Sequence, residues 1–144
     1  MENFEIIARA VIIQDNKILL CKRKDRDYYF LPGGHIEFGE RADEALAREI
    51  KEELGVETRA MSFIGTMENI FTENGERHHE FNVFFSVELA ENRSESCEEH
   101  LCFAFANIAN LARENILPAE LKIILSSWLE NKQIFWASQL DILK

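Results

Sequence analysis

The chain has 144 residues, of which 47% are hydrophobic and 29% charged, so it fits one globular domain with an enclosed core and is not broadly disordered. Sixteen Lys and Arg residues against 26 Asp and Glu residues give a formal net charge of −10, which argues against binding to a nucleic-acid polymer through charge. No apolar run approaches the roughly 20 residues that span a bilayer, and the acidic start does not resemble a signal peptide, so no membrane partner is expected.

The first half of the chain predicts two strands, a short extended piece and a helix. Apolar and β-branched residues predict strands over 4–13 and 17–23, joined by a hairpin turn at Asp15-Asn16. Residues 28–31 are extended and lead into Pro32-Gly33-Gly34. A helical periodicity follows over 42–54, with Gly55 as the residue that ends the helix.

The second half predicts three more strands and a closing helix. Strands are expected over 56–72 and 77–89 around the turn dipeptide Asn74-Gly75, and again over 101–107. A helix is expected from near Pro118 to about Asn131. The strands lie before, between and after the helices, which predicts a single α/β domain over 1–144 with a mixed sheet flanked by helices. The tail 132–144 is apolar enough to pack, in a place that the sequence does not reveal, or to serve a homodimer.

Cysteine usage indicates the compartment. The chain has an odd number of cysteines, three, and no two of them have a short spacing of the CxxC kind; they are Cys21, Cys97 and Cys102. Reduced thiols are the simplest interpretation, which favours a cytoplasmic protein.

Three carboxylates on the predicted helix suggest chemistry. Glu49, Glu52 and Glu53 stand at i, i+3 and i+4, so at about 100° of rotation per residue they share one arc of the helix. The apolar residues Leu46, Ile50 and Leu54 form a different face. Clustered oxygen ligands suit a hard divalent cation, whereas a solvated acidic face is the alternative interpretation.

The residues around this helix favour the metal site. Gly33-Gly34 allow close approach of the backbone, Glu40 adds a carboxylate at the entry to the helix, and Arg48 can orient a carboxylate by hydrogen bonds. Residues 34–56 resemble the signature of the Nudix hydrolase family, G-x5-E-x7-R-E-U-x-E-E-x-G-U, where U is aliphatic. Its defined positions are all matched, by Gly34, Glu40, Arg48, Glu49, Ile50, Glu52, Glu53, Gly55 and Val56.

The resemblance implies the Nudix fold, an α/β/α sandwich, and a Mg²⁺- or Mn²⁺-dependent pyrophosphohydrolase. Such enzymes hydrolyse a phosphoanhydride in a nucleoside diphosphate linked to another group. By position in the motif, Glu49, Glu52, Glu53 and the Gly33 carbonyl would be metal ligands, with Glu40 as a supporting carboxylate and Arg48 orienting the glutamates. Metal ions would neutralise the pyrophosphate oxygens and align a water for attack.

A carboxylate must take the proton of that water. The family draws this base from the signature segment 34–56, called the Nudix box, or from a loop outside it. Glu98 and Glu99, just before the strand at 101–107, are the loop candidates. A solvated turn is the competing interpretation of the same two residues.

Three other charged residues are candidates for substrate binding. Arg23 lies in a basic group directly after the second strand and could contact a phosphate, or it could belong to a solvated hairpin end. Arg9 interrupts an apolar strand and needs either a substrate or an internal salt bridge. Glu80 could face the catalytic cleft, where the metal and substrate would bind.

The nucleotide substrate is left open by the sequence. Ile70-Phe71-Thr72 stands where subfamilies for ADP-ribose and for dinucleoside polyphosphates have a characteristic proline or tyrosine. A nucleoside triphosphate and a nucleotide sugar such as ADP-ribose are therefore both candidates. The alternative function is a Nudix-fold sensor that binds a nucleotide without cleaving it, although such proteins tend to have lost glutamates that this chain keeps.

Overall fold

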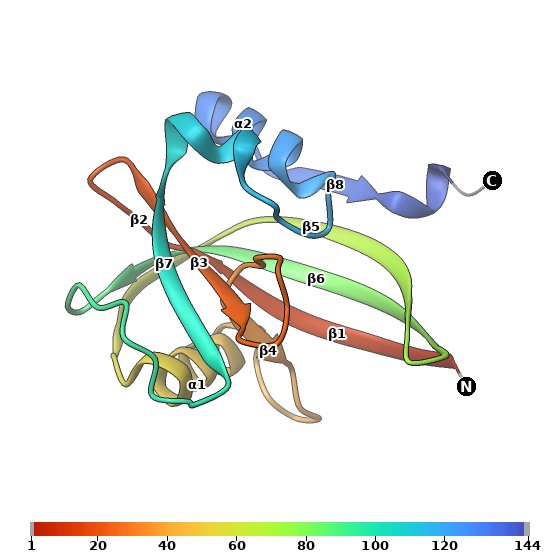
Figure 1. Cartoon of the computed structure of the whole chain (residues 1–144), viewed down its shortest axis with the longest axis horizontal. Coiled ribbons are helices and arrows are strands. Elements are labelled where there is room, and N and C mark those ends of the chain that lie inside the picture. Colours follow the sequence, from red (N-terminus) through yellow and green to blue (C-terminus); the bar gives the residue numbers. More distant parts are fainter. Residues whose placement is uncertain (1, 143–144) are drawn as a thin grey trace.

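The computed structural model describes residues 2–142, which form two sheets and two α-helices (Figure 1). The larger sheet is mixed, since β1 pairs in parallel with β6, and β5 with β8, whereas its other pairs are antiparallel. Its strand order is β4 (Gly33–His35), β1 (Glu2–Val11), β6 (Glu76–Leu89), β5 (Thr58–Glu73) and β8 (Phe135–Ser138). The smaller, antiparallel sheet has the order β2 (Ile13–Gln14), β3 (Lys17–Arg23) and β7 (Leu101–Asn107).

The two helices pack into separate hydrophobic clusters, and Figure 1 shows the strands between them. The cluster of α1 (Ala42–Leu54) includes its residues Leu46, Ile50 and Leu54 and residues Ala8 and Ala10 of β1. The other cluster contains Leu121, Leu125 and Trp128 of α2 (Leu121–Asn131), with Leu20 of β3 and Phe84 of β6. The predicted α/β/α architecture is confirmed.

Both predicted hairpin turns are present. Asp15 and Asn16 have φ angles of 52° and 61°, and Asn74 and Gly75 have 51° and 79°, the left-handed values that two-residue hairpin turns require. The first strand begins and ends two residues earlier than the predicted 4–13, because the chain leaves the larger sheet after Val11 and enters the smaller one at Ile13. The first hairpin therefore joins β2 to β3.

The C-terminal part differs most from the prediction. Helix α2 begins at Leu121 because a turn precedes it, in which the Leu121 N–H donates to the Pro118 carbonyl at 3.0 Å. The tail adds β8 to the edge of the larger sheet and then forms a 3-10 helix over Gln139–Ile142. Phe135 packs over Gly65, where a Cβ would overlap its ring. The tail thus packs against β5, and residues 143–144 of it lie outside the described residues.

None of the helices within residues 2–142 is both long and apolar enough to cross a membrane.

Candidate active site

Helix α1 carries the candidate site because its faces differ in chemistry. Leu46, Ile50 and Leu54 are fully buried and fix the helix against the sheet. Gly55 ends it in the left-handed conformation, and its N–H donates to the Lys51 carbonyl at 2.9 Å, as predicted. Burial of one face holds the carboxylates of the other in a defined place.

Glu53 differs from the other two carboxylates in being buried. The residue is 7% exposed, whereas the Glu52 side chain is 51% exposed. Oε2 of Glu53 has no hydrogen-bond partner, and burial, followed by the negative charge of Glu49, raises the pKa of Glu53 to about 8. A buried carboxylate of this kind is unfavourable unless a proton or a cation neutralises it. The acidic face is therefore not solvated throughout.

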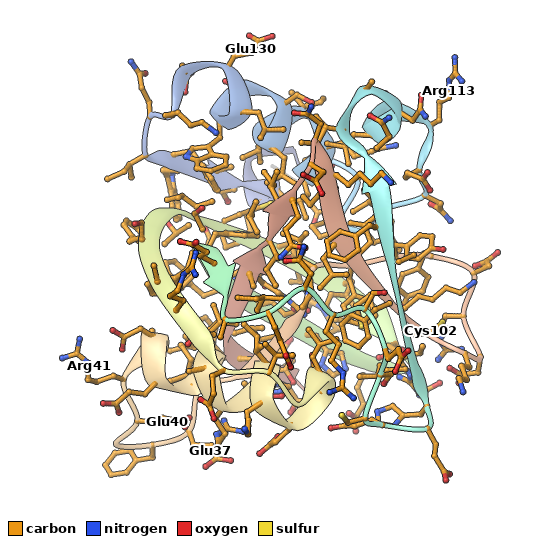
Figure 2. All side chains as sticks on the ribbon, turned by 90° about the vertical axis from the view of Figure 1, so that its left-hand side faces the viewer. Glu37, Glu40, Arg41, Cys102, Arg113 and Glu130 are labelled. Carbon is orange, nitrogen blue, oxygen red and sulfur yellow. The ribbon has the colours of Figure 1, made fainter. Side chains whose placement is uncertain are left out.

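Arg48 lies among the remaining carboxylates. Its Nε and Nη2 donate to the two oxygens of Glu40 at 2.8 and 3.0 Å, and Nη1 donates to Glu49 at 3.0 Å and to Glu52 at 3.4 Å. The bonds from Arg48 lower the pKa of Glu40, and bonds to Glu40 raise the pKa of Arg48. Glu40 lies with Glu37 in the loop before α1 (Figure 2). One guanidinium thus connects that loop to the helix.

The two glycines of β4 make room for this cluster. A Cβ on Gly34 would overlap the carboxylate of Glu49, and a Cβ on Gly33 would overlap the Ala8 carbonyl. Gly33 also has φ of 147°, which side chains rarely adopt. Glycine at both positions lets the β4 backbone lie directly against β1 and against Glu49.

The structure separates the two candidate bases. Glu98 is partly buried, its Oε2 lies 3.3 Å from Nε2 of His100, and its charge is among those that raise the pKa values of Glu49 and Glu53. Glu99 is exposed. The loop is tied to the helix, since the Cys97 N–H donates to the Glu53 carbonyl at 2.7 Å. Glu98 is accordingly the one of the two whose charge acts on the carboxylates of α1.

The donor set of α1 fits a metal ion in its chemistry but not in its present arrangement. Within residues 2–142, no three His, Cys, Asp or Glu side chains are arranged so as to hold one. The chemistry nevertheless fits a hard divalent cation, because the donors are carboxylate oxygens and Oε2 of Glu53 is buried and unpaired beside the charge of Glu49. Glu49 and Glu52 would have to turn from Arg48 towards Glu53 to complete such a site.

Arg9 and Glu80 lie together on the larger sheet. Nη1 of Arg9 donates to the Leu31 carbonyl at 3.0 Å, Nε donates to Asn82 at 3.4 Å, and Nη2 lies 3.7 Å from Glu80. Burial raises the pKa of Glu80, and Nδ2 of Asn82 donates to Asn69 at 2.9 Å. The internal salt bridge left open by the sequence is present. The sequence did not point to Asn69 and Asn82 as members of this buried polar group. The polar residues Glu80 and Asn82, two positions apart on one strand, could have indicated that this strand face is polar.

Arg23 stands apart from these residues. It is the last residue of β3, and its half-exposed side chain makes contacts of 3.4 Å with Asp25.

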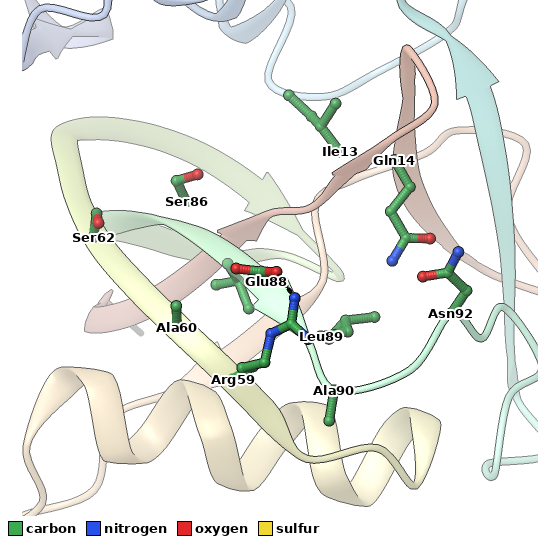
Figure 3. Close-up of a pocket in the computed structure, with 11 residues that line it drawn as sticks. Ile13, Gln14, Arg59, Ala60, Ser62, Ser86, Glu88, Leu89, Ala90 and Asn92 are labelled. Carbon is green, nitrogen blue, oxygen red and sulfur yellow. Dashed lines mark hydrogen bonds and ion pairs between the residues drawn. The ribbon is translucent and has the colours of Figure 1, made fainter.

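Two surface pockets lie near the fold's loops. An open pocket of about 520 Å³ is lined by β2, β5 and β6 residues, including Gln14, Ser62 and the Arg59–Glu88 ion pair, and by no predicted site residue (Figure 3). Another, of about 470 Å³, is lined by Lys24, Glu98 and Glu99 among others. Neither of these two pockets is lined by the carboxylates of α1, so the chemistry of the side chains is a better guide to the site than pocket size.

The family model of the NUDIX domain matches residues 5–126, and the chain therefore belongs to the NUDIX hydrolase family. It is 32% identical to an ADP-ribose pyrophosphatase of Methanocaldococcus jannaschii over 72% of this chain and 62% of that protein, less than two thirds of its length. It is 30% identical to a candidate 8-oxo-dGTP diphosphatase of Bacillus subtilis over 79% of this chain and 77% of the relative. A NUDIX hydrolase structure from Nitrosomonas europaea has the same fold, with a TM-score of 0.69 and 22% identity over 99% and 97% of the two chains.

Proposed function

We propose that the chain is a metal-dependent pyrophosphohydrolase that cleaves the phosphoanhydride of a nucleoside diphosphate linked to a further group. The observation that carries this proposal is the buried, unpaired Oε2 of Glu53 on α1, beside Glu49. A carboxylate in that position destabilises the fold by itself, and a divalent cation would neutralise it. Family membership supplies the reaction class.

Glu49, Glu52 and Glu53 would hold Mg²⁺ or Mn²⁺, with the Gly33 carbonyl as a further ligand and Glu40 as a supporting carboxylate. The bound metal would neutralise the pyrophosphate oxygens and lower the pKa of an attacking water. Arg48 would act as a positioning residue, because its four hydrogen bonds to Glu40, Glu49 and Glu52 fix where those carboxylates lie.

Glu98 is the better candidate for the general base. Its carboxylate is partly buried and its charge contributes to the raised pKa of Glu53, whereas Glu99 is exposed. The proton of the attacking water would pass to an oxygen of Glu98, whose other neighbour is the His100 ring at 3.3 Å. A base inside the box, at Glu49, Glu52 or Glu53, is the alternative.

Arg9 and Glu80 would contact the nucleotide. Their charged groups are 3.7 Å apart, which is long for a hydrogen bond, so both retain capacity for a polar ligand. Arg23 would contact a phosphate from the end of β3. A nucleoside triphosphate and a nucleotide sugar remain the two candidate substrates, and the relatives named above include one protein of each kind.

The chain keeps all the glutamates of the box, which disfavours the second candidate function, a sensor that binds nucleotides without turnover.

The cysteines are free thiols, which is consistent with a cytoplasmic setting; they are Cys21, Cys97 and Cys102.

A turnover assay with two product readouts tests the proposal. Hydrolysis of a nucleoside triphosphate to the monophosphate releases pyrophosphate, which inorganic pyrophosphatase converts to phosphate. Cleavage of ADP-ribose gives two phosphomonoesters, which alkaline phosphatase converts to phosphate while the intact substrate resists it. We expect turnover with Mg²⁺ in one of these arms.

Glu53→Gln should lower kcat by several orders of magnitude, and Glu44→Gln, on the exposed first turn of the same helix, should not. Nucleotide binding by calorimetry without turnover in either arm, with Mg²⁺ or Mn²⁺, would establish the sensor instead. Near-normal activity of Glu53→Gln would contradict the assignment of the site.

A further inference from the structure

Helix α1 covers only part of its face of the larger sheet. Ala8 and Ala10 of β1 are fully buried in the cluster that contains Leu46, Ile50 and Leu54 of α1. Phe4 and Ile6 alternate with their neighbours in the same way and share that face, but they are 65% and 44% exposed. Figure 1 shows β1, β6 and β5 extending beyond the end of α1 with no helix over them.

The neighbouring strands continue this exposed face. Ile6 stands opposite Phe81 in the parallel register, and the ring of Phe81 lies 5.9 Å from that of Trp136 on β8. Phe63 of β5 is opposite Phe85 and 44% exposed, and Trp136 is 60% exposed. Ile134, directly before β8 and two residues from Trp136, is 69% exposed. We call this set the outer patch; it comprises Phe4, Ile6, Phe63, Phe81, Ile134 and Trp136.

The outer patch is large for a solvent-facing surface. At about 150–250 Å² for each covered aromatic side chain and somewhat less for isoleucine, the exposed fractions of the five residues other than Phe81 amount to roughly 500 Å². That is most of the roughly 800 Å² that each partner contributes to a stable interface of standard size. Its richness in Phe and Trp is typical of the centre of a protein interface.

The charged side chains on the same face as the outer patch, Glu68 and His79, are paired with each other. Oε2 of Glu68 lies 3.0 Å from Nε2 of His79, and the Ser138 hydroxyl donates to Oε1 at 2.9 Å. The Phe4 ring packs edge-on against the His79 ring at 5.1 Å. Because both oxygens of Glu68 have partners on the same face, a docking surface can cover them without stranding a charge.

We propose that the outer patch is the interface of a symmetric homodimer, in which it docks against the same patch of a second copy. The patch reaches the free side of β8, where the structure of residues 2–142 places no further strand. An isologous interface needs one self-complementary surface, and a neutral apolar patch is self-complementary, because each copy brings the side chains that the other must cover. An acidic patch would not serve, since each protomer carries a net charge of −10.

Sedimentation velocity between 1 and 500 µM tests the proposal on the full chain. We expect dimerisation with a Kd in the micromolar range. Because the two protomers carry the same negative net charge and repel, the dimer should be tighter in 300 mM than in 20 mM NaCl. Trp136→Glu and Ile6→Glu should each raise Kd at least tenfold. Ile123→Glu, which changes a 76% exposed residue on α2, is the matched control and should leave Kd unchanged.

Fluorescence gives a readout that needs no variant. Trp128 is already buried, so a blue shift of tryptophan emission with rising protein concentration reports burial of Trp136. A monomer throughout the concentration range, or a Kd that Ile123→Glu raises as much as Trp136→Glu, overturns the proposal. Neither measurement involves nucleotide or turnover, so the result is independent of the proposed function.

Discussion

Replacing Glu53 by Gln measures the free energy that the buried carboxylate costs the metal-free protein. The pKa of this group rises from an ordinary value of 4.5 to about 8 on folding. The folded state therefore binds the proton more tightly than the unfolded chain, and stability falls as pH rises from about 4.5 through about 8. At pH 7 the loss is on the order of 3 kcal/mol, at 1.36 kcal/mol per pKa unit.

Glu53→Gln removes this ionisation but leaves a buried amide, which costs about 1–2 kcal/mol where it finds no partner. At pH 8 the loss from ionisation reaches about 4 kcal/mol, so we expect the variant to be about 2–3 kcal/mol more stable than wild type at pH 8, and equal or less stable at pH 5. Glu52→Gln is the matched control, because its side chain on the same helix is 51% exposed. Its effect should stay within about 0.5 kcal/mol at both pH values.

Urea unfolding with EDTA at pH 5 and pH 8 gives these differences directly. Added Mg²⁺ should then stabilise wild type by mass action and stabilise Glu53→Gln less. If the difference in free energy of unfolding between Glu53→Gln and wild type were the same at pH 5 and pH 8, Glu53 would have the same pKa in the folded and the unfolded chain. That result would refute the reasoning from burial. An equal Mg²⁺ effect on both proteins would remove Glu53 from the metal site.

Three further predictions concern residues around the site. Glu98→Gln should lower kcat by roughly 10²–10⁴ with little change in KM, whereas Glu99→Gln should be near normal; full activity in both would place the base in the box. Arg23→Ala should raise KM about tenfold and Lys24→Ala much less, and equal effects in steady-state kinetics would exclude a specific phosphate contact from Arg23. Arg41→Thr should raise the free energy of unfolding by about 0.5 kcal/mol, as measured in thermal melts. Arg41 occupies the N-cap of α1 without a side-chain cap bond, and the hydrogen bond that a Thr cap adds should stabilise more than the lost exposed ion pair between Arg41 and Asp43. Arg41→Ala, which loses the pair and gains no cap, should be destabilised, and a Thr variant no better than Ala would contradict the capping argument.

Local patterns were sufficient for the elements whose stability depends on near neighbours. The helical periodicity and Gly55 placed both ends of α1, and the turn dipeptides at Asp15-Asn16 and Asn74-Gly75 placed both hairpins. Backbone conformation at these positions is decided within a few residues, so the sequence is enough.

Features that depend on distant pairing could not be predicted in the same way. A helical wheel puts Glu53 beside Glu49 but does not show that the loop before β7 covers it, with Cys97 bonded to its carbonyl. The bond between Asn82 and Asn69 depends on the register of β5 against β6. The tail had a clear apolar character, but its place beside β5 depends on the space that Gly65 leaves for Phe135.

The parallel pairing of β1 with β6 has a consequence for how the molecule assembles. β1 is the first strand of the chain, and its partner over Glu2–Val11 begins only at residue 76. Closing so long a loop is slow compared with forming the local hydrogen bonds of α1. During synthesis, the N-terminal strand must wait until residues 76–89 have left the ribosome. Since β1 supplies Ala8 and Ala10 beneath α1, the surface that positions the glutamates of the helix is complete only once β6 is available to pair with β1.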